Sequence, residues 1–318
     1  MIEQQTASGS SIGKQTCRCC GSTNVISAGH KLGTYVNQTF DYFRCADCNF
    51  LFVSPFLGPE VYTINYYNGS GPDPYVDYAT EYDDYRGTDR VLEFRDLARV
   101  AEAQIERSTD PVNWLDFGCG SGGFLKFLRD KRFLSAQGAD RKIFPCGHDV
   151  GQWADRLKNN DQFSIYTLEE LRRLPANTFD IISMIEVLEH IPYPQEPLSL
   201  ATHLLKPGGL LLLTTGNLSS PVAKKKGLNY RYCVSEIHIS LFDPVCLKRA
   251  YHGAGLAPID VRYRGVVDFK AIKTVRGRFI KTFARLLVKI PGVTRLIDHF
   301  YGVSAMPCAR KPYTAGTV

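Results

Sequence analysis

The sequence has no long apolar run, and this absence excludes whole classes of protein. A membrane-spanning helix needs roughly 18 consecutive apolar residues. The longest candidates here are Ile181–Leu188, which contains Glu186, and the four leucines at 210–213. The N-terminal segment MIEQQTASGSSIGKQ is polar and lacks the apolar stretch of a secretory signal. We therefore expect a cytoplasmic protein.

The composition excludes fibrous and disordered proteins. The chain has 318 residues, of which 44% are hydrophobic and 22% are charged. These values are typical of a globular protein and not of a collagen, a coiled coil or a disordered chain. At roughly 150 residues per domain the length predicts about two domains, with enough chain to bury a sizeable core.

The net charge of +6 is unevenly distributed. Residues 262–312 contain 12 Lys or Arg and two acids, so this segment carries +10 and the remaining chain carries −4. An excess of positive charge indicates nucleic acid or another anionic surface. Because the excess belongs to the C-terminal segment, a nucleic-acid partner is disfavoured without being excluded.

Ten cysteines fall into two groups. Five lie between residues 17 and 48, and Cys17, Cys20, Cys45 and Cys48 form the pattern C-x2-C-x24-C-x2-C. Two thiolates at i and i+3 hold one side of a tetrahedral Zn²⁺, and a second pair completes the coordination. Gly21 and Asn49 follow the two pairs and tolerate positive φ. Residues 34–43 have the β-branched and aromatic composition of hairpin strands. We predict a structural zinc ribbon, with Cys19 as a spare; a reduced, metal-free cluster is the alternative.

Tyrosines dominate the segment that follows. Seven of the 17 fall between residues 62 and 85, interrupted by glycine and proline. They indicate either packing between domains or an aromatic lid over a cationic or planar ligand. From about residue 88 the apolar spacing predicts a helix that reaches Ile105.

A strand followed by a glycine-rich turn begins at Val112. Val112–Phe117 is apolar, Gly118, Gly120 and Gly122 follow, and apolar residues at helical spacing come next. Glycine lets the backbone approach a ligand closely. Ser135–Ala139 is expected to be a second strand ending at Asp140, where a carboxylate can accept both hydroxyls of a ribose. Further elements are a strand over Ile181–Ile185, a helix near 195–205, a turn at KPGG and a strand over Leu210–Thr215.

Four segments in this order, LDFGCGSG, GAD, FDIISMIEVLEHI and LLKPGGLLLLTTGN, resemble the class I S-adenosylmethionine (SAM)-dependent methyltransferases. The resemblance covers about residues 112–260 and is closest to the branch that includes the ubiquinone-biosynthesis O-methyltransferases. With its four cysteines, the chain also resembles zinc-ribbon-bearing methyltransferases of bacterial sugar and polysaccharide pathways. The implied fold class is α/β, a Rossmann-like class I methyltransferase domain with a small N-terminal zinc ribbon.

The resemblance implies roles for individual residues. Gly118, Gly120 and Gly122 would line the amino-acid part of SAM, Asp116 would hold its amino group, and Asp140 would bind the ribose. The adenine would lie near Arg141, Leu168 and Glu169, although TLEELRR departs from the family pattern there. Ile185 and Glu186 would reach the methyl donor.

A set of acidic and histidine residues is the candidate catalytic group. In E-x-x-E-H, Glu186, Glu189 and His190 share one face if a helical turn forms, and His238 follows later. The set resembles the metal ligands of small-RNA 2′-O-methyltransferases, so these four residues are candidate Mg²⁺ ligands. His238 is alternatively a general base, with His190 and Glu186 as further catalytic candidates; a purely structural role is the remaining alternative.

We divide the chain into a flexible N-terminus at 1–14, the zinc ribbon at 15–55 and a connector, lid and helix at 56–108. The methyltransferase domain follows at 109–262 and a basic extension at 263–318. Within the extension, residues 276–290 predict a basic amphipathic helix, which either contacts an anionic membrane or covers the core. The expected acceptor is a small molecule or glycan: a sugar, nucleotide-sugar or glycan intermediate. Alternatives are sugar C-methylation, quinone or phenol O-methylation, RNA methylation, and a non-catalytic binding module. The oligomeric state is left open.

Overall fold

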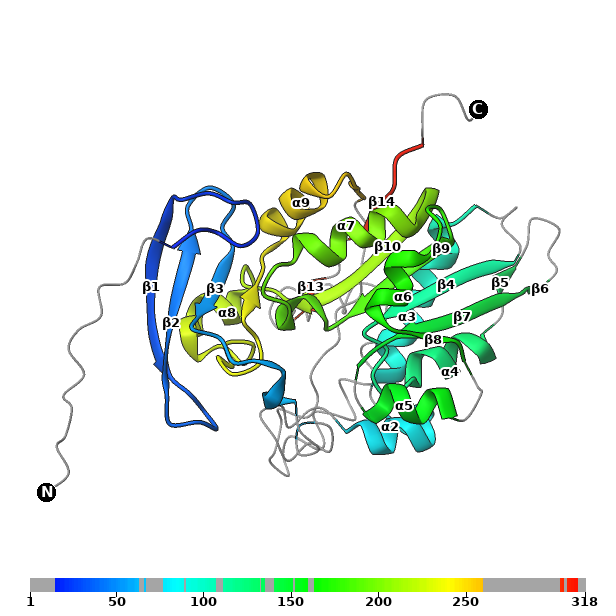
Figure 1. The fold of residues 1–318 in the computed structure, drawn as a ribbon, viewed down its shortest axis with the longest axis horizontal. Coiled ribbons are helices and arrows are strands. Elements are labelled where there is room, and N and C mark those ends of the chain that lie inside the picture. The colour runs from blue at the N-terminus through cyan, green and yellow to red at the C-terminus, as the bar shows by residue number, and fades with distance from the viewer. Residues whose placement is uncertain are drawn as a thin grey trace, which may run out of the picture.

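A computed structural model describes most of the chain (Figure 1). The described residues are 15–62, 66, 77–88, 90–106, 111–131, 133–134, 140–150, 152–159, 163–259, 304–305 and 308–313. The predicted flexible N-terminus and the amphipathic helix over 276–290 lie outside them. Within these ranges no helix is long and apolar enough to cross a bilayer.

The N-terminal sheet is antiparallel and has the strand order β1-β2-β3-β11. Its strands are β1 (Val25–Leu32), β2 (Thr39–Cys45), β3 (Leu51–Ser54) and β11 (Ser240–Leu241). The hairpin expected between the cysteine pairs is present, and the second half of the predicted segment, residues 39–43, lies in β2. The fourth strand comes from the other end of the chain, because Ser240 pairs with Phe52 and Leu241 with Leu51. The sheet therefore extends beyond the predicted ribbon of residues 15–55.

The main sheet has the order β12-β14-β10-β9-β4-β7-β8, with β13 paired to β10. Strands β8, β7, β4, β9 and β10 are parallel, and β14 runs antiparallel between β10 and β12. Taken from β8 to β12 and numbered in chain order, the seven strands of this path follow 3-2-1-4-5-7-6. This is a doubly wound arrangement in which the last strand of the chain, β14, is antiparallel. The strands are β4 (Val112–Phe117), β7 (Ile143–His148), β8 (Ile165–Tyr166), β9 (Phe179–Ile185), β10 (Leu205–Gly216), β12 (Ala257–Ile259), β13 (Ser304–Ala305) and β14 (Cys308–Arg310).

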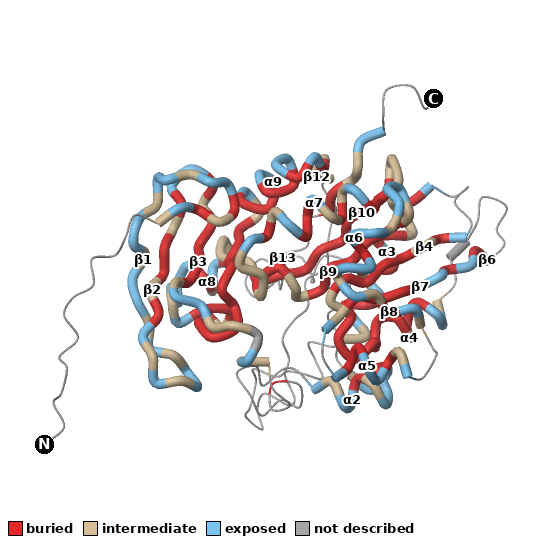
Figure 2. The backbone as a smooth tube through the Cα atoms, in the orientation of Figure 1, coloured by how far each residue is buried: buried red, intermediate tan, exposed pale blue. Residues whose placement is uncertain are grey.

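Helices cover both faces of the main sheet, and the leucines of β10 show how. Successive side chains of a strand point to opposite faces. Leu210 and Leu212 accordingly pack with α3 and α4, while Leu211 and Leu213 pack with α6, α7 and α9. Both faces are therefore buried, as Figure 2 shows for the central strands. The helices are α2 (Tyr78–Asp84), α3 (Arg90–Gln104), α4 (Gly123–Asp130), α5 (Gln152–Asn159), α6 (Leu168–Arg173), α7 (Gln195–Leu204), α8 (Pro221–Lys226) and α9 (Pro244–Gly253).

The main sheet extends beyond the C-terminal boundary predicted at residue 262. Leu210–Leu212 of β10 pair with Cys308–Arg310, and Ala257–Ile259 of β12 pair with the same strand. The last strand of the methyltransferase sheet therefore lies inside the segment assigned to a basic extension. The predicted turn at KPGG is also different, because residues 206–209 belong to β10, where the pairing register shifts between Leu205 and Leu210.

Candidate functional site

The carboxyl ends of β4, β7 and β9 meet at one edge of the sheet, and the glycine-rich turn lies there. Gly118 N and Cys119 N donate hydrogen bonds to His148 O at the end of β7, at 2.7 and 3.0 Å. Gly122, with φ of 78°, is the N-cap of α4. A Cβ atom at Gly122 would stand 2.7 Å from a Leu157 methyl group, so this turn requires glycine for its conformation and for space.

Two carboxyl groups, one buried and one half-buried, flank the turn. Asp116, near the end of β4, accepts a hydrogen bond of 2.7 Å from Ser183 Oγ, and burial raises its pKa to about 7. Asp149, directly after β7, accepts hydrogen bonds from the backbone N–H groups of Gly120 and Val150. Burial raises the pKa of Asp149 to about 6. Desolvation disfavours both charges, so a cationic or hydroxyl-bearing ligand at this edge would stabilise the ionised forms.

The acid at the end of the second parallel strand is thus Asp149, and the prediction of Asp140 is wrong. Ile143, not Ser135, opens the strand, since Val112 pairs with Ile143. Asp140 lies in β6 (Asp140–Arg141), which forms a hairpin with β5 (Phe133–Leu134) before the amino end of β7. Arg141 is fully buried there and donates to Glu106 O at 2.9 Å. Neither residue lies at the carboxyl edge of the main sheet, so the expected ribose contact of Asp140 and adenine contact of Arg141 lose the placement on which they rested.

Leu168 and Glu169 follow the third strand, as expected. β8 pairs with the end of β7, and Thr167 caps α6 by exchanging hydrogen bonds with Glu170. Glu169 is exposed and forms an ion pair with Arg173. Their contact with an adenine ring stays a prediction.

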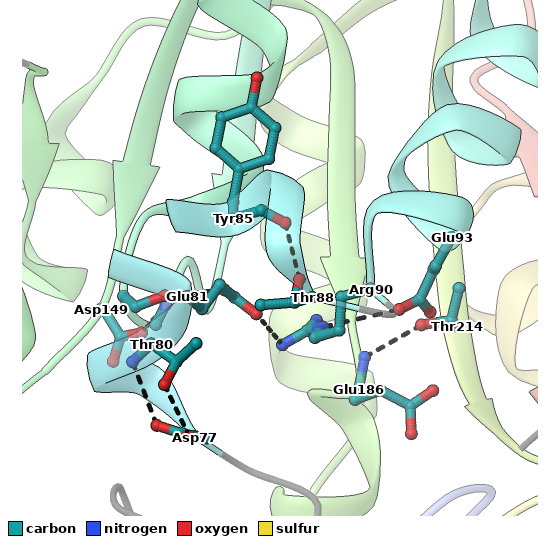
Figure 3. A network of polar contacts seen from close by, with 12 residues as sticks. Asp77, Thr80, Glu81, Tyr85, Thr88, Arg90, Glu93, Asp149, Glu186 and Thr214 are labelled. Carbon is teal, nitrogen blue, oxygen red and sulfur yellow. Dashed lines mark hydrogen bonds and ion pairs between the residues drawn. The ribbon is translucent and has the colours of Figure 1, made fainter. Parts of the chain in front are cut away.

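An ionic network from α2 and α3 reaches the glycine turn, and the sequence reasoning missed it (Figure 3). Arg90 pairs with Glu81 at 3.3 Å and with Glu93 at 3.7 Å. Glu81 in turn accepts a hydrogen bond of 2.7 Å from Ser121 Oγ. Burial and the neighbouring Glu186 raise the pKa of Glu93 to about 7. The available signal was a charged residue, Glu93, on the otherwise apolar face of an amphipathic helix.

The residues of E-x-x-E-H form a 3₁₀ turn, Leu188–His190, after β9. Glu189, His190 and His238 bring their ligand atoms within 4.8 Å of one another. Thr215 Oγ1 donates to Glu189 at 2.8 Å, and burial together with the charge of Glu186 raises the pKa of Glu189 well above its usual range. Glu186 lies outside this group of three and accepts a hydrogen bond from Tyr232. Ile185 ends β9 immediately before Glu186, as expected.

Both histidines of this group are oriented by backbone carbonyls. His238 Nδ1 lies 3.0 Å from Tyr232 O and His190 Nδ1 lies 3.1 Å from Ile237 O. A carbonyl only accepts, so each Nδ1 carries a hydrogen, and in a neutral ring Nε2 then keeps its lone pair. Burial lowers the pKa of His238 to about 4, which keeps the imidazole neutral.

Part of the tyrosine-rich segment contacts these histidines. Tyr62 Oη lies 3.1 Å from His190 Nδ1, and the rings of Tyr62 and Tyr66 meet the His190 ring edge-on. Tyr85, by contrast, packs in the core against Phe127. The described tyrosines therefore differ in their surroundings, and the role of a lid over a ligand stays a prediction.

Comparison with known proteins identifies the family of this chain. A family model described as a methyltransferase domain matches residues 85–261, more than half of the chain. The chain belongs to this family. It is a SAM-dependent methyltransferase with a Rossmann-like α/β fold.

The curated relatives of this methyltransferase include several O-methyltransferases. It is 26% identical over 220 residues to the ubiquinone biosynthesis O-methyltransferase of Aeromonas salmonicida, covering 63% of this chain and 90% of that one. It is 41% identical over 138 residues to the enzyme of the same name from Nitrosococcus oceani, covering 42% and 58%. A solved SAM-dependent methyltransferase from Archaeoglobus fulgidus aligns with a TM-score of 0.44 at 18% identity, covering 74% and 99%.

The four predicted zinc ligands of the methyltransferase lie together. Cys17 Sγ is 3.6 Å from Cys48 Sγ, and Cys20 Sγ is 3.6 Å from Cys45 Sγ. A tetrahedron with Zn–S bonds of about 2.3 Å has edges of about 3.8 Å, so these spacings fit one ion. Gly21 and Asn49 have positive φ, as expected for both knuckles.

Proposed function

We propose that the methyltransferase binds SAM over the turn Gly118–Gly122 and methylates a hydroxyl oxygen of a ring-shaped acceptor. The observation that carries the cofactor site is the glycine turn between the buried Asp116 and the half-buried Asp149. Asp149 would accept the ribose hydroxyls, and Asp116 would interact with the cationic amino-acid end. Arg90, connected to the turn through Glu81 and Ser121, is suited to the carboxylate of the same end. Bound SAM supplies an electrophilic methyl group on a sulfonium.

The histidine group would remove the proton from the acceptor. His238 is neutral, and its Nε2 is free of a proton, which suits a general base. Transfer to an oxygen held in line with the sulfonium then depends mainly on the orientation of donor and acceptor. Tyr62 and Tyr66, next to His190, offer ring faces and edges on which a planar or sugar ring can pack.

A metal ion is the second way in which this group could activate the acceptor. Glu189, His190 and His238 would be its ligands, with Glu186 as a further carboxylate. Glu186 and Glu189 each have one buried carboxylate oxygen, Oε1, without a hydrogen-bond partner among the described residues. The Nδ1–H···O=C bonds are the outer contacts that metal-binding histidines usually have. Two imidazoles fit Mn²⁺, Fe²⁺ or Zn²⁺ better than the Mg²⁺ expected from the resemblance.

The acceptor we favour is a sugar, nucleotide-sugar or glycan intermediate, because of the resemblance of the cysteine module to sugar-pathway enzymes. A phenol is the second candidate, supported by the names of the O-methyltransferase relatives. The four cysteines would hold a structural zinc, since a closed four-thiolate site has no open position for catalysis. Metal analysis of Cys45→Ser tests this zinc: unchanged stoichiometry would refute the assignment.

Calorimetry with SAM and a product assay with both acceptor classes test the proposal. We expect SAM to bind, and His238→Ala to lose turnover while SAM affinity is retained. His203→Ala, an exposed histidine in the last turn of α7, is the control and should stay active. If a chelator leaves activity intact and His238→Ala abolishes it, the base mechanism holds and the metal mechanism fails. Absence of SAM binding would refute the enzyme assignment of this site.

A further inference from the structure

A second group of three cysteines lies beside the proposed zinc site. Cys19, Cys48 and Cys246 have sulfur atoms within 4.8 Å of one another. All three are buried, with 3%, 2% and 0% of their surfaces exposed. Cys48 belongs to both groups, because it also lies 3.6 Å from Cys17. From the sequence alone, Cys19 is a spare, and Cys246 lies outside the N-terminal group of five cysteines.

Cys246 comes from the methyltransferase domain and is held firmly against the ribbon. It lies in the first turn of α9, where its backbone N–H donates to the N-cap Asp243 at 2.7 Å. The same Asp243 accepts a hydrogen bond from the side chain of Asn49, in the second cysteine knuckle. The α9 N-terminus and this knuckle are thereby fixed to each other.

Cys19 lies beside a second element of the methyltransferase domain. Gln195, at the start of α7, is next to the Cys19 sulfur. Gln195 Nε2 donates to Ala250 O of α9 at 3.2 Å, so α7 and α9 are fixed to each other beside the three cysteines.

We propose that Cys19, Cys48 and Cys246 bind a second zinc ion, with the Cys48 thiolate bridging it to the ion held by Cys17, Cys20 and Cys45. The inference rests on the four-cysteine site proposed above. Three thiolates supply three tetrahedral positions, and the fourth falls to a solvent ligand or to the Gln195 amide oxygen. On binding, Zn²⁺ displaces one proton each from Cys19 and Cys246. The net charge of the cluster therefore stays at that of one zinc with four thiolates, and no further charge is buried. The second ion would cross-link the ribbon to α9 through its coordinate bonds to Cys19, Cys48 and Cys246.

Zinc content of the purified full-length protein, measured by mass spectrometry, tests this site. We expect two zinc ions per chain in the wild type, and one in Cys246→Ala and in Cys19→Ala. Cys308→Ala is the matched control: it removes an equally buried cysteine of the same size from β14, far from both groups in sequence, and should keep two. ¹¹³Cd-exchanged wild type should show two cadmium resonances coupled through the shared sulfur, and Cys19→Ala should show one.

One zinc in the wild type, unchanged in Cys246→Ala, overturns the second site and leaves the four-cysteine site standing. No zinc in the wild type overturns both. A Cys19–Cys246 disulfide, seen as the loss of two hydrogens in the intact mass after metal removal under non-reducing conditions, also overturns the proposal. If Cys246→Ala does not fold, stepwise cadmium titration of the wild type decides, because a single saturating equivalent contradicts the two-ion cluster.

Discussion

Replacing Asp149 with asparagine is the sharpest test of the cofactor site. The carboxylate of Asp149 already accepts the N–H groups of Gly120 and Val150 and retains lone pairs for a ligand. An amide offers one oxygen in place of two and carries no charge. Loss of a hydrogen bond to a charged group costs about 1.5–3 kcal/mol, which corresponds to a SAM dissociation constant weaker by about 10- to 150-fold.

Asp140→Asn is the control for this measurement, because Asp140 is the acid that the sequence pattern selected and the sheet places at the opposite edge. Calorimetric titration of SAM into both variants should leave Asp140→Asn within about 0.5 kcal/mol of the wild type. Circular dichroism of both variants establishes that each is folded. Equal losses in the two variants, or a larger loss in Asp140→Asn, would refute the reasoning from strand order.

Three further predictions concern stability. Folding raises the pKa of Asp116 from 3.8 to about 7, so its stabilising contribution is present below the unfolded value and is lost as the pH rises through 7. The Tm of the ligand-free wild type should therefore fall relative to that of Asp116→Asn between pH 5 and pH 8, in scanning calorimetry; parallel curves would contradict this. Gly122→Ala should lower the free energy of unfolding more than Gly227→Ala does. Both glycines have positive φ, which costs an alanine about 1–2 kcal/mol. Only at Gly122 would the added Cβ also clash with a leucine methyl group. Urea titrations with similar midpoints for the two variants would argue against a tightly packed turn. Ending the chain at Val303 removes β13 and β14 and should expose apolar sheet edges, detected as dye binding and aggregation, whereas a chain ending at Tyr313 should behave as the wild type does.

Much of the fold could be predicted from strong local signals. The apolar strand before Gly118, the helix over Arg90–Gln104 and the strand that ends at Ile185 each have a clear period or a bounded apolar run. β7 has no such signal, because IFPCGH includes a proline and a glycine, which weaken strand propensity. The acid of GAD was therefore selected by its spacing, and it lies at the wrong edge.

The functional site was predictable only where its residues are close in sequence. The glycine turn and the E-x-x-E-H turn are each one continuous segment. Contacts between distant segments carry no local pattern, so the pairing of Arg90 with Glu81 and the approach of Cys246 to Cys48 required the folded chain. The basic extension predicted from residue 263 failed to include β14 in the sheet for the same reason. Charge composition does not show that a short strand near the C-terminus pairs with β10.

The strand β11 makes the N-terminal sheet depend on the order of synthesis. Ser240, which pairs with β3, follows Ser54 by 186 residues. At about 5–20 residues per second, the hairpin leaves the ribosome roughly 10–40 s before the strand that covers its edge. During this interval the free edge of β3 and the buried aromatic side chains beside it are available to other chains. Early metal binding by the two knuckles would close the hairpin in this period, so zinc supply during translation should govern the yield of folded protein more than zinc added afterwards.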